Sequence, residues 1–113
     1  MAGETNKQGA SAETEGDWRK VTSLADVRAN IDRLDGLIVP LLCERHHFVT
    51  AAAQFKPSAE GVVVPARVEE IIRHVREIAR ANDVDPDTME KVYRDMIETF
   101  TLDEQAHWRA NHK

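Results

Sequence analysis

Residues 24–56, LADVRANIDRLDGLIVPLLCERHHFVTAAAQFK, decide the fold of this chain. Apolar side chains recur along this stretch in steps of three and four, with one arginine among them: Leu24, Val27, Ile31, Leu34, Ile38, Leu41, Arg45, Phe48, Ala52 and Phe55. This spacing places them on one face of an α-helix and matches the repeat of a coiled-coil seam. We therefore predict one long amphipathic helix, with Ser23 or Thr22 as its N-cap.

The predicted helix is too long for a small domain. At a rise of about 1.5 Å per residue, the stretch from Leu24 to Lys56 spans about 50 Å. A compact domain of about 100 residues has a radius of gyration of only about 13 Å. The helix would project far beyond its own domain, so we expect a partner chain to cover it.

Pro40 lies inside this stretch, where it removes a backbone donor and clashes with the carbonyl of Gly36. Such a proline costs about 3 kcal/mol in a helix interior. Because the apolar phase is the same on both sides of Pro40, we expect one kinked helix. The alternative is two helices that meet at this residue.

Two shorter helices are predicted after the long one. Pro65 suits the first turn of the second helix, which ends near Asn82, and Asp85 and Pro86 open the third. The intervening Val62–Val64 run is too short to build a sheet without other strands. The predicted domain is therefore all-α, with one long and two shorter helices in residues 21–113. Residues 1–20 lack apolar periodicity and are predicted to be a disordered leader.

Composition excludes several classes of protein. The chain has 113 residues, enough for one domain, and 15 Lys+Arg against 20 Asp+Glu give a net charge of −5, which argues against a nucleic-acid partner. Apolar runs are too short to span a membrane or to serve as a secretion signal, so no membrane partner is expected. The single cysteine, Cys43, cannot form an internal disulfide. We therefore predict a cytoplasmic protein, with the Cys43 thiol buried and inert.

Four ionisable residues border the predicted apolar faces. Arg45 interrupts the long stripe, Arg28 lies beside it, and Lys56 follows Phe55 at its end, while Glu104 lies between two aromatic residues of the third helix. These groups could form structural ion pairs at the edge of a core. They could instead bind a small dicarboxylate, because arginine grips carboxylates with two hydrogen bonds. Arg28 and Arg45 are 17 positions, or about 25 Å, apart on one helix, so a shared pocket requires two antiparallel chains.

The chain resembles the small all-helical chorismate mutases, and within them the branch that contains the bacterial isochorismate pyruvate lyases of salicylate biosynthesis. The resemblance is carried by LADVRANIDRLDGLIVPLL, ERHHFVTAAAQFK, VPARVEEII and DEQAHWR, and it runs from Leu24 to Arg109. It implies an intertwined homodimer of three-helix chains, as the length of the first helix independently requires. It also implies an enzyme of chorismate metabolism, serving aromatic amino acid or salicylate biosynthesis, that needs no metal or cofactor.

The resemblance assigns roles by matching motifs. Arg28 would be donated across the dimer to one substrate carboxylate, and Arg45 would bind a carboxylate within its own chain. Lys56 would donate a hydrogen bond to the ether oxygen whose C–O bond breaks, and Glu104 would contact that oxygen from the other side. Arg67 matches an arginine that recurs in this branch, and we expect it to have a structural role rather than to bind substrate.

The position matched by Glu104 is glutamine in many members of the family, and a slip of one residue would place Gln105 there instead. A glutamate donates a hydrogen bond only when protonated, so activity should fall as pH rises above the pKa of Glu104. The leading hypothesis is the rearrangement of chorismate to prephenate. Elimination of pyruvate from isochorismate, which gives salicylate, is the close alternative. Residues 61–66, without an acid or an arginine, favour that lyase branch. A non-catalytic helical dimerisation module is the third hypothesis.

Overall fold

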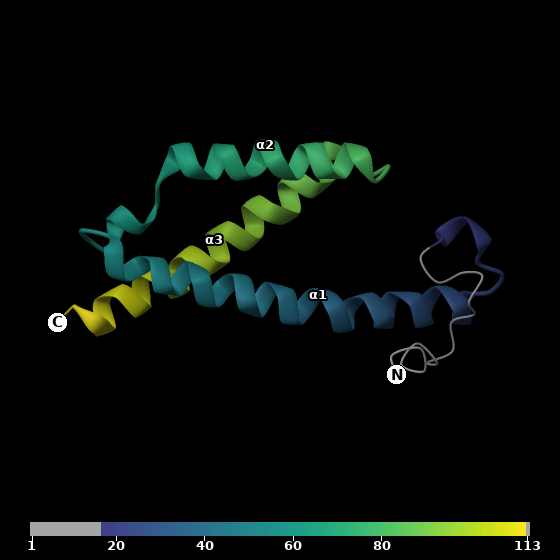
Figure 1. The fold of residues 1–113 in the computed structure, drawn as a ribbon, viewed down its shortest axis with the longest axis horizontal. Coiled ribbons are helices and arrows are strands. Elements are labelled where there is room, and N and C mark those ends of the chain that lie inside the picture. Colours follow the sequence, from purple (N-terminus) through teal and green to yellow (C-terminus); the bar gives the residue numbers. More distant parts are fainter. Residues whose placement is uncertain (1–16, 113) are drawn as a thin grey trace. The chain divides into compact units, whose positions relative to one another are not determined.

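The computed structural model describes residues 17–112 of the chain. Within them the regular structure is entirely helical, with three α-helices and three short 3-10 helices (Figure 1). The described residues divide into two compact units, one of residues 17–45 and the other of residues 46–112. The predicted all-α class with one long and two shorter helices is confirmed. Residues 1–16 of the predicted leader lie outside the described part, and its last residues, Trp18–Lys20, form the 3-10 helix η2.

Helix α1, Leu24–Ala52, is the long helix expected from the sequence. Its N-cap is Ser23, whose hydroxyl accepts a hydrogen bond from the Asp26 amide at 3.0 Å. With 29 residues it is roughly 43 Å long. Pro40 lies inside the continuous helix, so the alternative of two helices meeting there is wrong. The α-helical geometry ends at Ala52, four residues before the expected end, and the chain tightens into the 3-10 helix η3, Ala53–Phe55.

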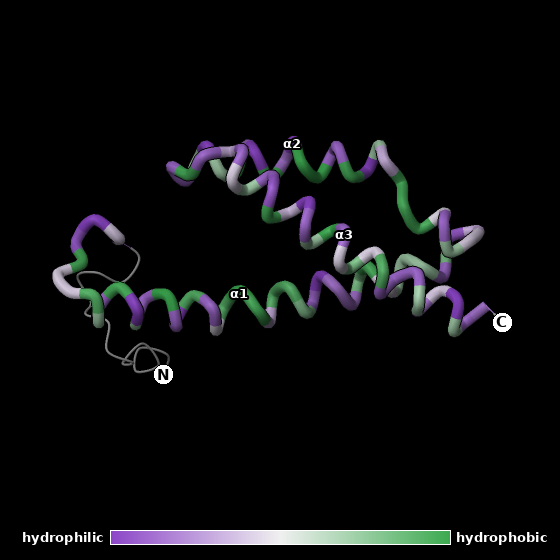
Figure 2. Tube along the Cα trace, turned by 180° about the vertical axis from the view of Figure 1, so that it is seen from behind, coloured by the Kyte–Doolittle hydropathy of each residue, from purple (hydrophilic) through white to green (hydrophobic). Residues whose placement is uncertain are grey.

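The apolar stripe of α1 is largely uncovered in the single chain. Leu41 is 64 % exposed and Phe48 is 70 % exposed, and the same holds along the helix for Leu24, Ile31, Leu34 and Ile38. Figure 2 shows this hydrophobic character running along α1. Cys43 is exposed as well, so the prediction of a buried thiol is wrong for the isolated chain. The physical reason is that one chain alone provides too little apolar surface to cover so long a helix.

The unit that begins at His46 contains the end of α1 and the rest of the chain. After η3 come the 3-10 helix η4, Glu60–Val62, helix α2, Pro65–Ala81, and helix α3, Pro86–Asn111. Both α-helices begin with proline at the first position, as predicted. Asp85 caps α3 by accepting a hydrogen bond from the Asp87 amide at 2.9 Å.

Helix α2 ends in a Schellman motif. Asp83, with φ of 62°, takes the left-handed conformation that usually requires glycine. The amide of the next residue, Val84, then donates to the Ala79 carbonyl at 3.0 Å and closes the turn. The chain reverses here, so that α3 packs back against α2 (Figure 1).

The core of this unit is small and uses short side chains. Helix α3 packs against α2, η3 and η4, and the buried apolar residues are Ala53, Ala59, Val62, Ile72, Val75 and Ala79. Arg94 of α3 adds ion pairs to Glu69 of α2, at 2.9 Å, and to Glu90 of its own helix, at 2.7 Å. Among the described residues, none of the helices combines the length and the apolar character needed to cross a membrane.

Candidate active site

Lys56 lies at the end of η3 and is held there by three hydrogen bonds. Its amide donates to the Ala53 carbonyl at 3.1 Å, and its carbonyl accepts from the indole N–H of Trp108 at 2.9 Å. The side-chain ammonium donates to the Val62 carbonyl at 3.2 Å. Because backbone and side chain are both anchored, the ammonium is held in a defined position at the side of α3.

Glu104 of α3 supplies the carboxyl that faces this ammonium. Its side-chain Oε2 lies 3.8 Å from Lys56 Nζ, and the residue is only 5 % exposed. Burial raises the pKa of Glu104 above its usual value, while the charges of Lys56 and His46 act in the opposite direction. Burial has the larger effect, so this carboxyl keeps its proton to a higher pH than an exposed glutamate.

The geometry separates Glu104 from its neighbour Gln105. The two residues point about 100° apart around α3, and it is Glu104 that is buried next to Lys56, whereas Gln105 is only half-buried. Arg67, in the first turn of α2, is exposed and forms an ion pair with Glu70 at 2.6 Å. A structural role for Arg67 stays a prediction.

The two remaining predicted residues, Arg28 and Arg45, belong to the unit that ends at Arg45. Arg28 is exposed on α1, two residues after the buried Asp26, and Arg45 is half-buried. Their approach to Lys56 and Glu104 across a dimer stays a prediction.

Two contacts of this site were missed by the sequence reasoning. The indole N–H of Trp108 anchors the Lys56 carbonyl. The His46 imidazole lies 2.5 Å from the carboxylate of Asp103, the residue directly before Glu104 on α3. The sequence carries no signal for either contact, because each joins residues more than 50 positions apart.

A pocket of about 410 Å³ lies beside this site, in the same unit of the chain. It is lined by Thr50, Ala51, Ala53, Gln54, His107, Trp108, Asn111 and His112. Its walls contain neither of the facing groups, Lys56 and Glu104, and carry no arginine or carboxylate. The described residues also contain no cluster of three His, Cys, Asp or Glu side chains that could hold a metal ion.

The arrangement can therefore present two hydrogen-bond donors to one oxygen atom. The Lys56 ammonium is one donor, and the protonated Glu104 carboxyl is the other. Such donors, held in place before reaction, stabilise negative charge that develops on an oxygen as a bond to it breaks. The described part of the chain thus combines a long helix that has an exposed apolar seam, two shorter helices, and a half-buried lysine that faces a buried glutamate.

The chain belongs to the chorismate mutase type II family, whose profile matches residues 27–105. It is also 33 % identical over 88 residues to an isochorismate pyruvate lyase of Pseudomonas aeruginosa. That alignment covers 78 % of this chain and 87 % of the relative. The predicted resemblance is therefore confirmed at the level of the family, and an enzyme of the mutase or lyase type is supported.

Proposed function

We propose that this protein is a chorismate mutase, which rearranges chorismate to prephenate. The observation that carries the proposal is the Lys56 ammonium 3.8 Å from the buried Glu104 carboxyl, in a chain of the chorismate mutase type II family. In the reaction the ether C–O bond breaks as a C–C bond forms within the same molecule. No nucleophile and no cofactor is needed, so binding a compact conformer and stabilising charge on the ether oxygen are sufficient.

Each donor has a distinct part in this proposal. Lys56 donates to the ether oxygen as negative charge grows there, and protonated Glu104 donates from the other side. Arg45 binds one substrate carboxylate and Arg28 of a second chain binds the other, because a planar guanidinium matches a carboxylate with two hydrogen bonds.

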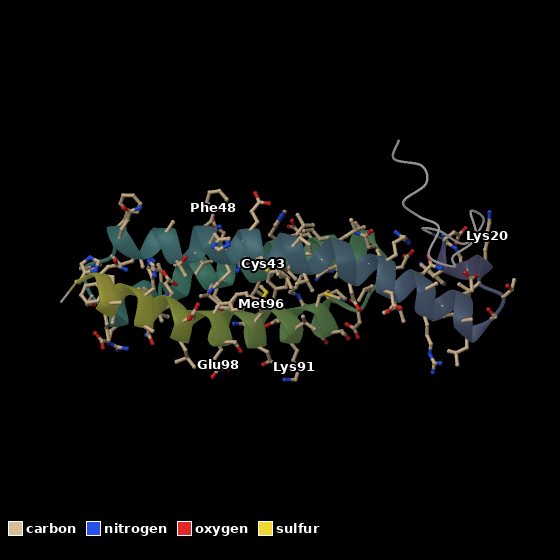
Figure 3. The ribbon with its side chains drawn as sticks, turned by 90° about the horizontal axis from the view of Figure 1, so that it is seen from below. Lys20, Cys43, Phe48, Lys91, Met96 and Glu98 are labelled. Atoms are coloured by element: carbon tan, nitrogen blue, oxygen red, sulfur yellow. The ribbon has the colours of Figure 1, made fainter. Side chains whose placement is uncertain are left out.

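The donation of Arg28 requires a homodimer. The exposed apolar seam of α1 supports this, because stripes of large exposed apolar residues mark interaction surfaces. Phe48, on this seam, points away from α3 in Figure 3. Two α1 helices packed antiparallel would bury the seam and bring Arg28 of one chain near Arg45 and Lys56 of the other.

A second candidate function is isochorismate pyruvate lyase. It is favoured by the relative from Pseudomonas aeruginosa, which carries that name. The same donors would serve, because isochorismate is also a dicarboxylate and its cleavage to salicylate and pyruvate breaks a C–O bond at the corresponding oxygen.

One experiment separates these functions. Purified protein is incubated with chorismate and with isochorismate, and substrate loss is followed together with prephenate, salicylate and pyruvate. Prephenate from chorismate, with little pyruvate from isochorismate, supports the mutase. Salicylate and pyruvate in equal amounts from isochorismate, with slow prephenate formation, would replace it by the lyase. No turnover of either compound would leave a non-catalytic helical module.

Mixing two inactive variants tests the dimeric site. Arg28→Ala and Lys56→Ala are unfolded together, refolded as a mixture and assayed. If Arg28 acts across the interface, half of the dimers contain one intact site, and activity returns to about a quarter of the wild-type value. Activity that stays at the level of the separate variants would show that Arg28 does not act across a dimer.

A further inference from the structure

His46, on the last turns of α1, has contacts that the proposed reaction does not use. Its imidazole Nε2 lies 2.5 Å from Asp103 Oδ2, and its ring centroid lies 4.4 Å from that of Phe100 at an interplanar angle of 43°. The second ring nitrogen, Nδ1, is buried without a hydrogen-bond partner in the described part of the chain. The imidazole is thus held firmly on one side only.

Both contacts of His46 lie on α3, within about one turn of Glu104. Asp103 immediately precedes Glu104, and Phe100 lies one turn earlier on the same helix. On the other side of Glu104, Lys56 follows directly after η3. His46 and Lys56 therefore hold this turn of α3 from two points of the chain that are ten residues apart.

We propose that His46 is a positioning residue, which fixes the α3 turn through Asp103 and Phe100 so that Glu104 faces Lys56. The role of Glu104 in this inference rests on the proposed function. The contact between His46 and Asp103 is independent of the proposed function, because it is present in the chain without substrate.

The charge of His46 gives this contact a second effect. Protonated His46 lowers the pKa of Glu104, in the same direction as Lys56, and both oppose the effect of burial. The groups whose charges act on Glu104 are Lys56, which follows η3, and His46 on α1, and Asp103 directly precedes Glu104 on α3. Farther along, Glu60 of η4 pairs with Arg109 of α3 at 3.5 Å. Since Asp103 holds His46 in place, losing the imidazole should change both the position and the titration of Glu104.

Two variants separate position from charge. His46→Gln keeps a side-chain donor for Asp103 but cannot become charged, whereas His46→Ala removes donor, ring and charge. His47→Gln is the matched control, because His47 is the exposed neighbour on the same helix. A change that all three variants share reflects the general cost of a substitution at this end of α1. An effect on Glu104 should instead be seen in the two His46 variants and not in His47→Gln.

The first readout is independent of catalysis. The titration of the Glu104 carboxyl is followed by ¹³C NMR in the substrate-free protein, with Glu104→Gln used to assign its signal. We expect the midpoint to move to higher pH in His46→Gln and to stay in place in His47→Gln. A Glu104 midpoint that is the same in His46→Gln and wild type would overturn the electrostatic part of the proposal.

The second readout is the rate with whichever substrate the protein turns over. His46→Ala should lower kcat by about tenfold or more, because a displaced catalytic group loses its alignment. His46→Gln should retain most of kcat while its pH profile moves together with the Glu104 midpoint. Full kcat in His46→Ala would overturn the positioning role. If neither substrate reacts in wild type, the proposed function fails, whereas the NMR result still tests the contact.

Discussion

The substitution Glu104→Gln gives the sharpest test of the site. Two opposing effects set the protonation of this carboxyl. At the 3.8 Å separation of Lys56 Nζ and Glu104 Oε2, the attraction of two unit charges is about 4 kcal/mol at an effective dielectric constant of about 20. Burying a carboxylate costs several kcal/mol. Burial has the larger effect, so the pKa of Glu104 is raised and the protonated form persists to higher pH.

The raised pKa predicts a particular pH–rate profile. If Glu104 must be protonated to donate to the ether oxygen, kcat/KM falls about tenfold for each pH unit above its pKa. The amide of glutamine donates at every pH. Glu104→Gln should therefore remove the falling limb and exceed the wild-type rate at high pH.

The assay is the initial rate of chorismate loss, with isochorismate in parallel, across a pH series at constant ionic strength. Glu98→Gln is the matched control, because Glu98 is exposed on the same helix, and in Figure 3 it lies on the side of α3 that faces away from the end of α1. An unchanged falling limb in Glu104→Gln would refute the reasoning, because another group would then carry the titration. Inactivity at every pH would also refute it, because the amide should replace the protonated acid.

The remaining predictions concern Lys56, Trp108, Asp83 and the pH dependence of stability. Lys56→Ala should lower kcat by about 10²–10³-fold, because it removes a donor to the developing oxyanion, and circular dichroism should show the fold retained. Trp108→Phe should cost about 1 kcal/mol in the free energy of unfolding, measured with urea, because the 2.9 Å hydrogen bond to the Lys56 carbonyl is lost, and it should lower kcat as well. Asp83→Val should cost about 1–2 kcal/mol because of the left-handed backbone at φ 62°, whereas Asp83→Gly should be neutral or stabilising. The pKa of Glu104 is higher in the folded than in the unfolded protein, so protonated Glu104 favours the folded state. This contribution to stability is fully present below the pKa of Glu104 in the unfolded chain and is lost as pH rises through its pKa in the folded protein. Urea midpoints across this range should therefore fall less with pH in Glu104→Gln than in wild type.

Much of the fold followed from local rules. The steps of three and four from Leu24 onward predicted α1, and prolines at the first helical position predicted the starts of α2 and α3. These signals are strong because they depend on nearby residues. The end of α1 was placed four residues late, because the apolar repeat continues to Phe55 while the backbone tightens into η3.

The sequence also supplied the candidate residues of the site, because a charged group on an apolar face is costly and stands out against the pattern. It left Glu104 and Gln105 as alternatives, since a helical repeat cannot say which of two neighbours meets a lysine 48 or 49 positions away. Packing of α3 against η3 answered this, placing Glu104 beside Lys56.

The sequence by itself determined the helical class, the family and the charged candidate residues of the site, because periodicity, caps and motifs depend on residues that are close together in the chain. Only the tertiary structure decided which groups meet: Glu104 with Lys56, Trp108 with the Lys56 carbonyl, and His46 with Asp103. Contacts between residues so far apart depend on how the helices pack, and the raised pKa of Glu104 depends on the burial that this packing creates.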